Sequence, residues 1–215
     1  MILSGANTGL GLETVRGLNK RGAKVYMLCR SEQRCNDAIE KLSVDCDHSR
    51  LIFQQCDMSK FSTIRECAKR IEQLEDRVDI LVNNAGIMFY PQFELTEDGH
   101  EMTWQSNYLG PLDLMTVDSK SLFGKVTPYY RSKLANVMHG QELAKQLIDS
   151  GVSDVTVNSL HPGLVSTDLA RDTFLSKPPM NKINACKQTS VNRAATDEAC
   201  RNLREYSLNA VGLSQ

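Results

Sequence analysis

The chain has 215 residues, of which 41% are hydrophobic and 24% are charged, and its formal net charge is −1. This composition is typical of a soluble globular protein and excludes wholesale disorder, and the length predicts a single domain. A charge so near zero gives no field that would attract nucleic acid or an anionic membrane. No apolar run reaches the ~18–20 residues of a membrane helix, and no signal-peptide core opens the chain, so we expect no membrane span and a cytoplasmic location.

The seven cysteines are an odd number, and none of them forms a Cys-x-x-Cys motif. The four histidines are not clustered beside them. This pattern argues against a disulfide framework and against a metal site, and it predicts reduced cysteines that pack as small apolar residues.

Short β-rich runs alternate with helical patterns through the first 160 residues. Apolar residues recur at helical spacing from Phe61 to Leu74 and again from Leu134 to Ile148, the second helix with Thr127 as N-cap and Pro128 in its first position. The predicted strands are 24–28, 51–53, 79–82 and 154–158. Such an alternation predicts βαβ units around a parallel sheet, hence an α/β fold. After a polar stretch, a last helix is expected from about residue 196.

A glycine-rich segment, Ser4-Gly5-Ala6-Asn7-Thr8-Gly9-Leu10-Gly11, lies between the apolar start and a helical pattern. Glycines at the end of a first strand allow a tight turn, and they let backbone N–H groups and a helix N-terminus approach a pyrophosphate. The spacing alone fits an ordinary glycine turn about as well. Its position between strand and helix favours a dinucleotide-binding turn.

The end of the second predicted strand carries Cys29-Arg30, where an acidic residue would bind the 2′-hydroxyl of NAD. An arginine can pair with the 2′-phosphate of NADP, which a carboxylate would repel. The alternative is a solvated surface arginine. The residue favours NADP over NAD as the cofactor.

Tyr129 and Lys133 are four residues apart on a predicted helix and therefore share a face. A phenol is a poor proton donor or acceptor at neutral pH, and a nearby ammonium group with a cationic nicotinamide would lower its pKa. Tyr129 could then give a proton to a carbonyl oxygen during hydride transfer, or take one from an alcohol. The spacing alone also allows Tyr130 to be the partner of Lys133.

Together these segments resemble the short-chain dehydrogenases/reductases, and within them the retinol dehydrogenase-like branch. The family motifs are matched in order by residues 4–11, 83–86 (Asn-Asn-Ala-Gly), Tyr129-x-x-x-Lys133, and Pro162-Gly163 with Thr167. The branch is matched by segments 107–110, 132–136, 158–163 and 203–213. The resemblance implies one NAD(P)-binding Rossmann domain over residues 1–215, a three-layer α/β/α doubly wound parallel sheet that lacks some of the usual helices and strands.

The resemblance also implies the roles of individual residues. Tyr129 would be the catalytic acid/base, Lys133 its electrostatic partner, and Asn107 would hold a water that links the lysine to solvent. Asp57 would contact adenine; alternatively it could simply cap the helix that follows, and the two roles are compatible. The remaining cofactor-binding residues would be Gly5, Asn7, Gly9, Leu10, Gly11, Arg30, Asn83, Ala85, Gly86, Pro162, Gly163 and Thr167.

Two intervals are shorter than the family pattern. Asn107 and Tyr129 are separated by too few residues for the rest of a helix, a strand and a loop. The family's substrate-binding serine would be Ser119, with Ser121 as a second candidate. Residues 168–195 are too polar to supply the usual substrate-covering segment, helix and last strand, so we expect an incomplete substrate side and exposed sheet edges.

The sequence therefore predicts an NADP-dependent oxidoreductase that interconverts a small apolar alcohol and its carbonyl compound, such as a retinoid, a steroid or another lipid. The alternative is an NADP-binding relative with weak or no turnover. The helix bearing Tyr129 is a common dimer surface in the family, which suggests a homodimer.

Overall fold

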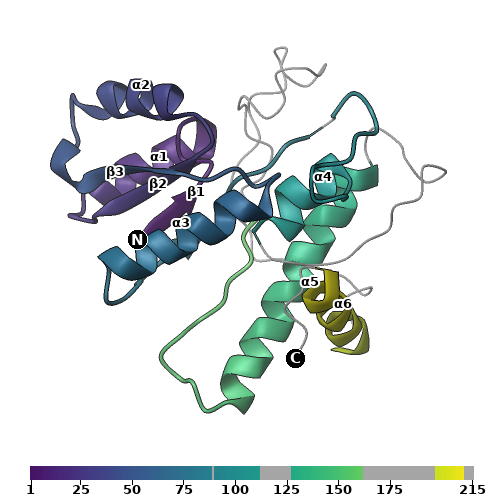
Figure 1. Cartoon of the computed structure of the whole chain (residues 1–215). Coiled ribbons are helices and arrows are strands. Elements are labelled where there is room, and N and C mark those ends of the chain that lie inside the picture. Colours follow the sequence, from purple (N-terminus) through teal and green to yellow (C-terminus); the bar gives the residue numbers. More distant parts are fainter. Residues whose placement is uncertain (89, 112–126, 162–196, 211–215) are drawn as a thin grey trace.

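In the computed structural model the described residues are 1–88, 90–111, 127–161 and 197–210. Four strands, β1 (Ile2–Ser4), β2 (Val25–Cys29), β3 (Leu51–Gln55) and β4 (Leu81–Val82), form a parallel sheet in the order β3-β2-β1-β4 (Figure 1). The strand predictions over 24–28, 51–53 and 79–82 are confirmed, with shifts of a few residues at the ends.

The predicted helices are also present. The one expected from Phe61 to Leu74 has those bounds as α3. The helix with the tyrosine–lysine pair begins at Thr127 itself, one residue earlier than predicted. The helices are α1 (Gly9–Asn19), α2 (Glu32–Leu42), the short η1 (His48–Arg50), α3 (Phe61–Leu74), α4 (Met102–Trp104), the π-turn η2 (Gln105–Leu109), α5 (Thr127–Asp149) and α6 (Asp197–Ala210).

Helices cover both faces of the sheet, and strand β2 shows why. All five of its residues are buried, because alternate side chains of a parallel strand enter different cores. Val25, Met27 and Cys29 pack with residues of α1 and α2. Tyr26 and Leu28 pack with Cys67 and Ile71 of α3 on the opposite face. The result is the α/β/α layering that the sequence predicts (Figure 1).

A separate core joins the sheet's helices to the second half of the chain. It contains Phe61 at the start of α3, Tyr108 and Leu109 of η2, Ala135 of α5 and Leu203 of α6. Helix α6 lies along α5 in Figure 1. This packing fixes α5 against the turn that carries Asn107.

The predicted strand at 154–158 does not form. This segment is without regular secondary structure and runs beside α5: a Cβ on Gly140 would lie 2.8 Å from Ser159 Oγ and 3.6 Å from Val157 Cγ1. A strand needs a hydrogen-bonded neighbour, and among the described residues the sheet ends at β4. Val155 and Leu160 are accordingly exposed, as is Leu81 in β4.

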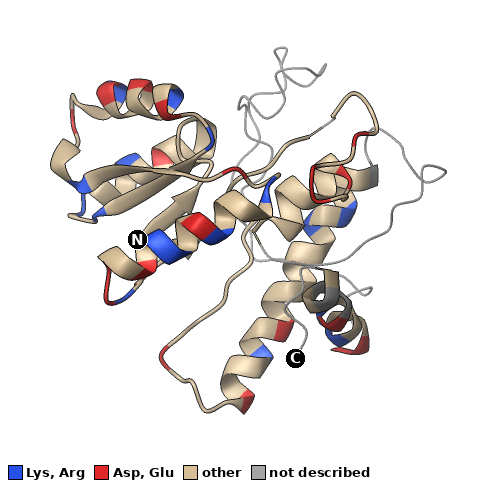
Figure 2. Ribbon diagram, viewed as in Figure 1, with Lys and Arg blue, Asp and Glu red and all other residues tan. Residues whose placement is uncertain are grey.

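The surface of the described helices is mixed in charge. Acidic and basic side chains are interspersed along α2 and α3 (Figure 2). No helix within the described ranges is both long enough and apolar enough to cross a membrane. Six cysteines lie in these ranges, and all six carry free thiols.

Candidate functional site

The candidate site lies at the carboxyl ends of β1 and β4. From β1 the chain adds β2 and β3 on one side, whereas β4 pairs with the other side of β1. In open parallel sheets a ligand crevice forms where the strand order reverses in this way. The glycine turn follows β1, and residues 83–86 follow β4, so these two predicted segments meet at that point.

The glycine turn has the backbone geometry that its sequence predicts. Gly5 has φ +64° and Gly9 has φ +54°, which are left-handed values that favour glycine. The Gly5 N–H donates to the carbonyl of Leu28 at 3.0 Å, which continues the parallel pairing of β1 with β2 one residue past Ser4. Helix α1 then starts at Gly9, and its N-terminal N–H groups create a partial positive charge suited to a phosphate.

Asn84 and Ser4 hold this turn against the segment that follows β4. Asn84 Nδ2 donates to the carbonyl oxygens of Ser4 at 3.0 Å and Gly5 at 3.1 Å. Ser4 Oγ accepts the N–H groups of Asn84 and Ala85, both at 3.1 Å. Neither side chain was among the predicted site residues, although both stand inside the predicted motifs. Their place inside two glycine-containing motifs is the signal that could have identified them.

Arg30 follows β2 directly and is exposed. No ion pair between described residues involves it. Its charge acts on Tyr90, whose pKa is raised mainly by a hydrogen bond to the Glu94 carboxylate and is lowered in part by Arg30. An accessible guanidinium at this edge of the sheet fits a ligand phosphate.

Asp57 lies in the turn between β3 and α3. Its Oδ1 accepts the N–H of Ser59 at 3.0 Å and the Ser59 hydroxyl at 2.7 Å. The carboxylate therefore shapes the turn, but the first N–H of α3, from Phe61, donates to Asp98 Oδ2 at 2.9 Å. Asp98 thus provides the carboxylate that accepts the first N–H of α3, although the sequence analysis did not single it out. The adenine contact of Asp57 stays a prediction.

Tyr129 and Lys133 lie on the same face of α5, and the structure decides between the two tyrosines. Lys133 Nζ is 5.5 Å from the centroid of the Tyr129 ring. Tyr130 points outward and is 65% exposed. Lys133 also approaches the segment after β4, since a Cβ on Gly86 would lie 3.4 Å from Nζ. The side chains of the pair and the candidate cofactor segment therefore converge.

Burial dominates the electrostatics of the pair in the chain without a ligand. Burial raises the pKa of Tyr129, and the neighbouring Tyr130 raises it further. Burial lowers the pKa of Lys133. The lowered phenol pKa was predicted for an ammonium together with a cationic nicotinamide, so it stays a prediction for the chain with its cofactor bound.

Asn107 occupies the middle of the π-turn η2 and is 1% exposed. Its side chain pairs with the backbone of Ile87: Oδ1 accepts the N–H at 2.7 Å and Nδ2 donates to the carbonyl at 2.9 Å. Its own carbonyl accepts from Asn136 Nδ2 at 3.2 Å. Asn107 thus ties the segment after β4 to α5, and the water that the resemblance implies stays a prediction.

Several predicted site residues lie outside the described residues. On the substrate side these are Ser119 and its alternative, Ser121. On the cofactor side they are Pro162, Gly163 and Thr167. Their roles therefore stay predictions.

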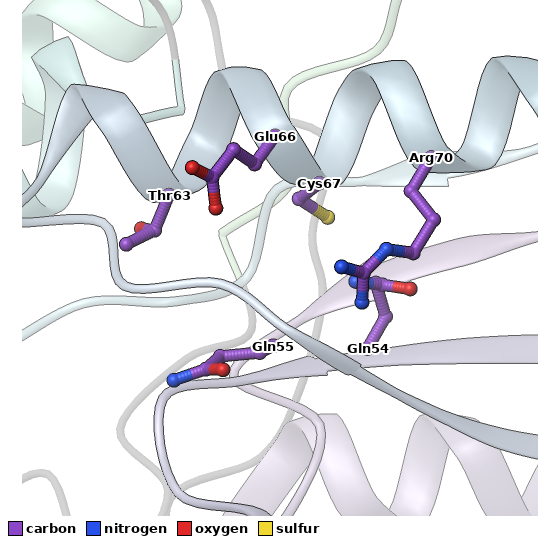
Figure 3. A pocket seen from close by; sticks show the side chains of 6 residues that line it. All are labelled: Gln54, Gln55, Thr63, Glu66, Cys67 and Arg70. Atoms are coloured by element: carbon purple, nitrogen blue, oxygen red, sulfur yellow. The ribbon is translucent and has the colours of Figure 1, made fainter.

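A small pocket of about 160 Å³ lies between β3 and α3 (Figure 3). None of the predicted site residues lines it. One lining residue, Thr63, is hydrogen-bonded to the predicted site residue Asp57: the Thr63 hydroxyl donates to the Asp57 carbonyl and accepts the Asp57 N–H. The lining side chains are Gln54, Gln55, Thr63, Glu66, Cys67 and Arg70.

Comparison with known proteins identifies the family. The model of the short chain dehydrogenase family matches residues 1–122. The chain therefore belongs to the short-chain dehydrogenases, as the four ordered motifs predict. Its described part has their Rossmann-type parallel sheet in a shortened form.

Two curated relatives from mouse (Mus musculus) show where in the family its similarity lies. The chain is 35% identical to retinol dehydrogenase 13 over 205 residues, which is 80% of this chain and 60% of that protein. It is 32% identical to retinol dehydrogenase 12 over 206 residues, 81% of this chain and 64% of that protein. The chain thus spans about three fifths of the length of these relatives.

Solved structures agree on the fold. An uncharacterized protein from Mycobacterium paratuberculosis has a TM-score of 0.75 at 24% identity, with 98% of this chain and 92% of that chain covered. A short-chain dehydrogenase from Sphingobium yanoikuyae in complex with NADPH has a TM-score of 0.65 at 19% identity, covering 84% of this chain and 78% of that chain. At such identities the likeness shows the fold alone.

Proposed function

We propose that the chain is an NADP-dependent oxidoreductase that interconverts a small apolar alcohol and its aldehyde or ketone. The observation that carries the proposal is the convergence of Tyr129 and Lys133 with Gly86 and Asn107, beside the glycine turn. The cofactor of the Sphingobium relative and the names of the retinol dehydrogenases support the same chemistry.

The residues of the turn fit a dinucleotide. A Cβ at Gly5 would lie 2.9 Å from the Cα of Ala85, so only glycine permits the close approach of the two segments that would hold the cofactor. The helix N-terminus at Gly9 would face the pyrophosphate, and Arg30 would pair with the 2′-phosphate. When bound, the nicotinamide supplies or accepts the hydride.

The protein itself supplies a proton and stabilises the negative charge that remains after the proton has been transferred. In the reduction direction Tyr129 gives its hydroxyl proton to the carbonyl oxygen as that oxygen gains negative charge. The half-buried phenol is protonated at neutral pH, since partial burial raises its pKa. The Lys133 ammonium then stabilises the phenolate that is left, aided by the positive charge of the oxidised cofactor.

The second candidate is an NADP-binding relative with little turnover. It is favoured by the sheet edge at β4 and by the segment 154–158, because the described residues supply no further strand beyond β4. The shared length with the retinol dehydrogenases leaves about two fifths of those proteins unmatched.

One experiment separates the two candidates. Binding of NADPH and NADH is measured by calorimetry, and reduction of retinal and of a panel of apolar ketones is followed with the wild type, Tyr129→Phe and Tyr130→Phe. An enzyme should lose turnover by ~10²-fold or more only in Tyr129→Phe, since general acid catalysis contributes about that much. Binding without Tyr129-dependent turnover would establish the second candidate, and equal loss in Tyr130→Phe would refute the assignment of the pair.

A further inference from the structure

The turn that carries Asn107 has an unusual backbone. The N–H of Gly110 donates to the carbonyl of Gln105 at 2.6 Å, five residues back, so the helix widens by one residue here. In a regular α-helix the partner of the Asn107 carbonyl would be the N–H four residues further on. That residue is Pro111, which has none. The sequence thus removes the regular helical donor from the Asn107 carbonyl.

Helix α5 provides a replacement. Asn136 Nδ2 donates to the Asn107 carbonyl at 3.2 Å. An unpaired buried carbonyl is costly, so this contact satisfies a group that the proline deprives of its α-helical donor.

A second contact from α5 holds the side chain of the same residue. Asn107 Nδ2 donates to Ser132 Oγ at 3.1 Å, and the Ser132 hydroxyl donates in turn to the carbonyl of Tyr129 at 2.7 Å. Ser132 is fully buried. A continuous chain of hydrogen bonds therefore runs from the Ile87 backbone through Asn107 and Ser132 to the turn of α5 that presents Tyr129.

Ser132 and Asn136 are four residues apart, so both lie on the side of α5 that faces η2. Lys133 lies between them in sequence and reaches Gly86, one residue before Ile87. Any shift of Asn107 would therefore change the spacing between the segment after β4 and the tyrosine–lysine pair.

From this geometry we infer that Ser132 and Asn136 are positioning residues that clamp Asn107 by its side chain and its carbonyl, and thereby set the distance between Tyr129–Lys133 and the cofactor. The inference rests on the proposed function for its catalytic consequence. The clamp itself is a property of the described residues and can be tested without turnover.

The test compares Ser132→Ala and Asn136→Leu with Gln146→Leu. Gln146 is a matched control, because it is an amide on the same helix whose Nε2 donates, among the described residues, to Glu142 and which lies ten residues from Asn136. In the first two variants kcat should fall ~10–100-fold while the KM for the carbonyl substrate changes less than threefold, as expected when the reacting groups are misaligned. The double variant should lose less than the product of the two single losses, because both contacts act on Asn107.

A second readout does not need activity. The ionisation of Tyr129 is followed by ultraviolet difference titration, with Tyr129→Phe in each background subtracted. Loosening the clamp should admit water, so the pKa of Tyr129 should fall toward its ordinary value of about 10 in Ser132→Ala and Asn136→Leu but not in Gln146→Leu.

The outcomes are distinct. If the titration shifts but the wild type turns over no substrate, the clamp is supported and the proposed function fails. If the wild type is active and folded Ser132→Ala keeps the wild-type kcat and titration, the clamp is refuted. Ser132→Ala removes a single oxygen and Asn136→Leu changes a half-buried site, so a failure of one variant to fold leaves the other to decide.

Discussion

The carbonyl oxygen of Gly5 fills the space in which Gly11 would carry a side chain. A Cβ on Gly11 would lie 2.6 Å from Asn84 Nδ2 and closer still to the Gly5 oxygen. Since Asn84 itself donates to that oxygen, the contact joins the glycine turn, the start of α1 and the segment after β4. Packing within the protein therefore requires a glycine at position 11, whether or not a ligand is bound.

Gly11→Ala should consequently destabilise the fold. Overpacking against backbone costs about 1–3 kcal/mol, and the affected atoms are a carbonyl and a hydrogen-bonded amide that cannot move away freely. Urea denaturation would measure the loss. Gly17→Ala on the same helix is the control: its Cβ would meet only Arg21 Nη1, at 3.6 Å, and should stabilise by ~0.5–1 kcal/mol through helix propensity. Equal effects of the two substitutions would contradict the packing argument.

Arg30→Ala should weaken NADPH binding about 10–100-fold and leave NADH binding unchanged, because a charge-assisted hydrogen bond contributes roughly 1.5–3 kcal/mol. Calorimetric titration with both cofactors measures this. Arg21→Ala removes the same charge at the opposite end of α1, where its guanidinium bonds to the Gly17 carbonyl, and should change neither affinity. A parallel loss of NADH affinity in Arg30→Ala would argue against a 2′-phosphate contact.

Lys133→Met should abolish turnover and raise thermal stability. Burial lowers the pKa of Lys133, which means that desolvation of its ammonium group costs free energy in the folded protein. An apolar side chain of similar length does not carry this cost. Lys145→Met, an exposed position on the same helix, serves as the control for both measurements.

The stability of the wild type should also depend on pH in a way that Lys133→Met removes. Because the folded-state pKa of Lys133 lies below the ordinary value of 10.5, the unfolded chain binds the extra proton between these two values, and the stability of the wild type should rise with pH across that window. Lys133→Met should lack this contribution. A Tm that falls on substitution would show that the ammonium has a stabilising partner.

His139 should make the fold sensitive to acid. It is 4% exposed, and neither ring nitrogen has a hydrogen-bond partner among the described residues. Burial, with Arg204 of α6 as a second cause, lowers its pKa from 6.5 to about 4. Below pH 6.5 the unfolded chain gains a proton that the folded chain does not, so stability should decline as the pH falls from 6.5 to about 4, by on the order of 3 kcal/mol.

Thermal melts of the wild type, His139→Leu and His139→Gln between pH 7 and 4 measure this decline. Both variants should lose the part of the pH slope that belongs to His139, whatever their stability at pH 7. A slope unchanged in both would show that other groups dominate acid unfolding.

Much of the fold follows from local sequence patterns. The alternation of β-rich runs with helical periodicity predicts β1 to β4, α3 and α5, since side-chain periodicity is set by the strand or helix itself. The segment 154–158 has a strand's pattern and forms none, because pairing depends on a neighbour elsewhere in the chain. The prediction of shortened connections on the substrate side concerns intervals that lie largely outside the described residues.

The candidate site divides in the same way. The sequence by itself placed Gly5 and Arg30 just after strands, Gly9 before a helix, and Tyr129 four residues before Lys133. Such spacing is a property of the local chain. The length of the chain predicted one domain, and the comparisons add that the chain spans about three fifths of two curated relatives.

Only the tertiary structure decided that Tyr129 rather than the exposed Tyr130 meets Lys133, and that burial raises the phenol's pKa. It also decided that Asn136 replaces the donor missing at Pro111. Burial, desolvation and long-range hydrogen bonds arise when segments distant in the sequence come together, so no local pattern encodes them.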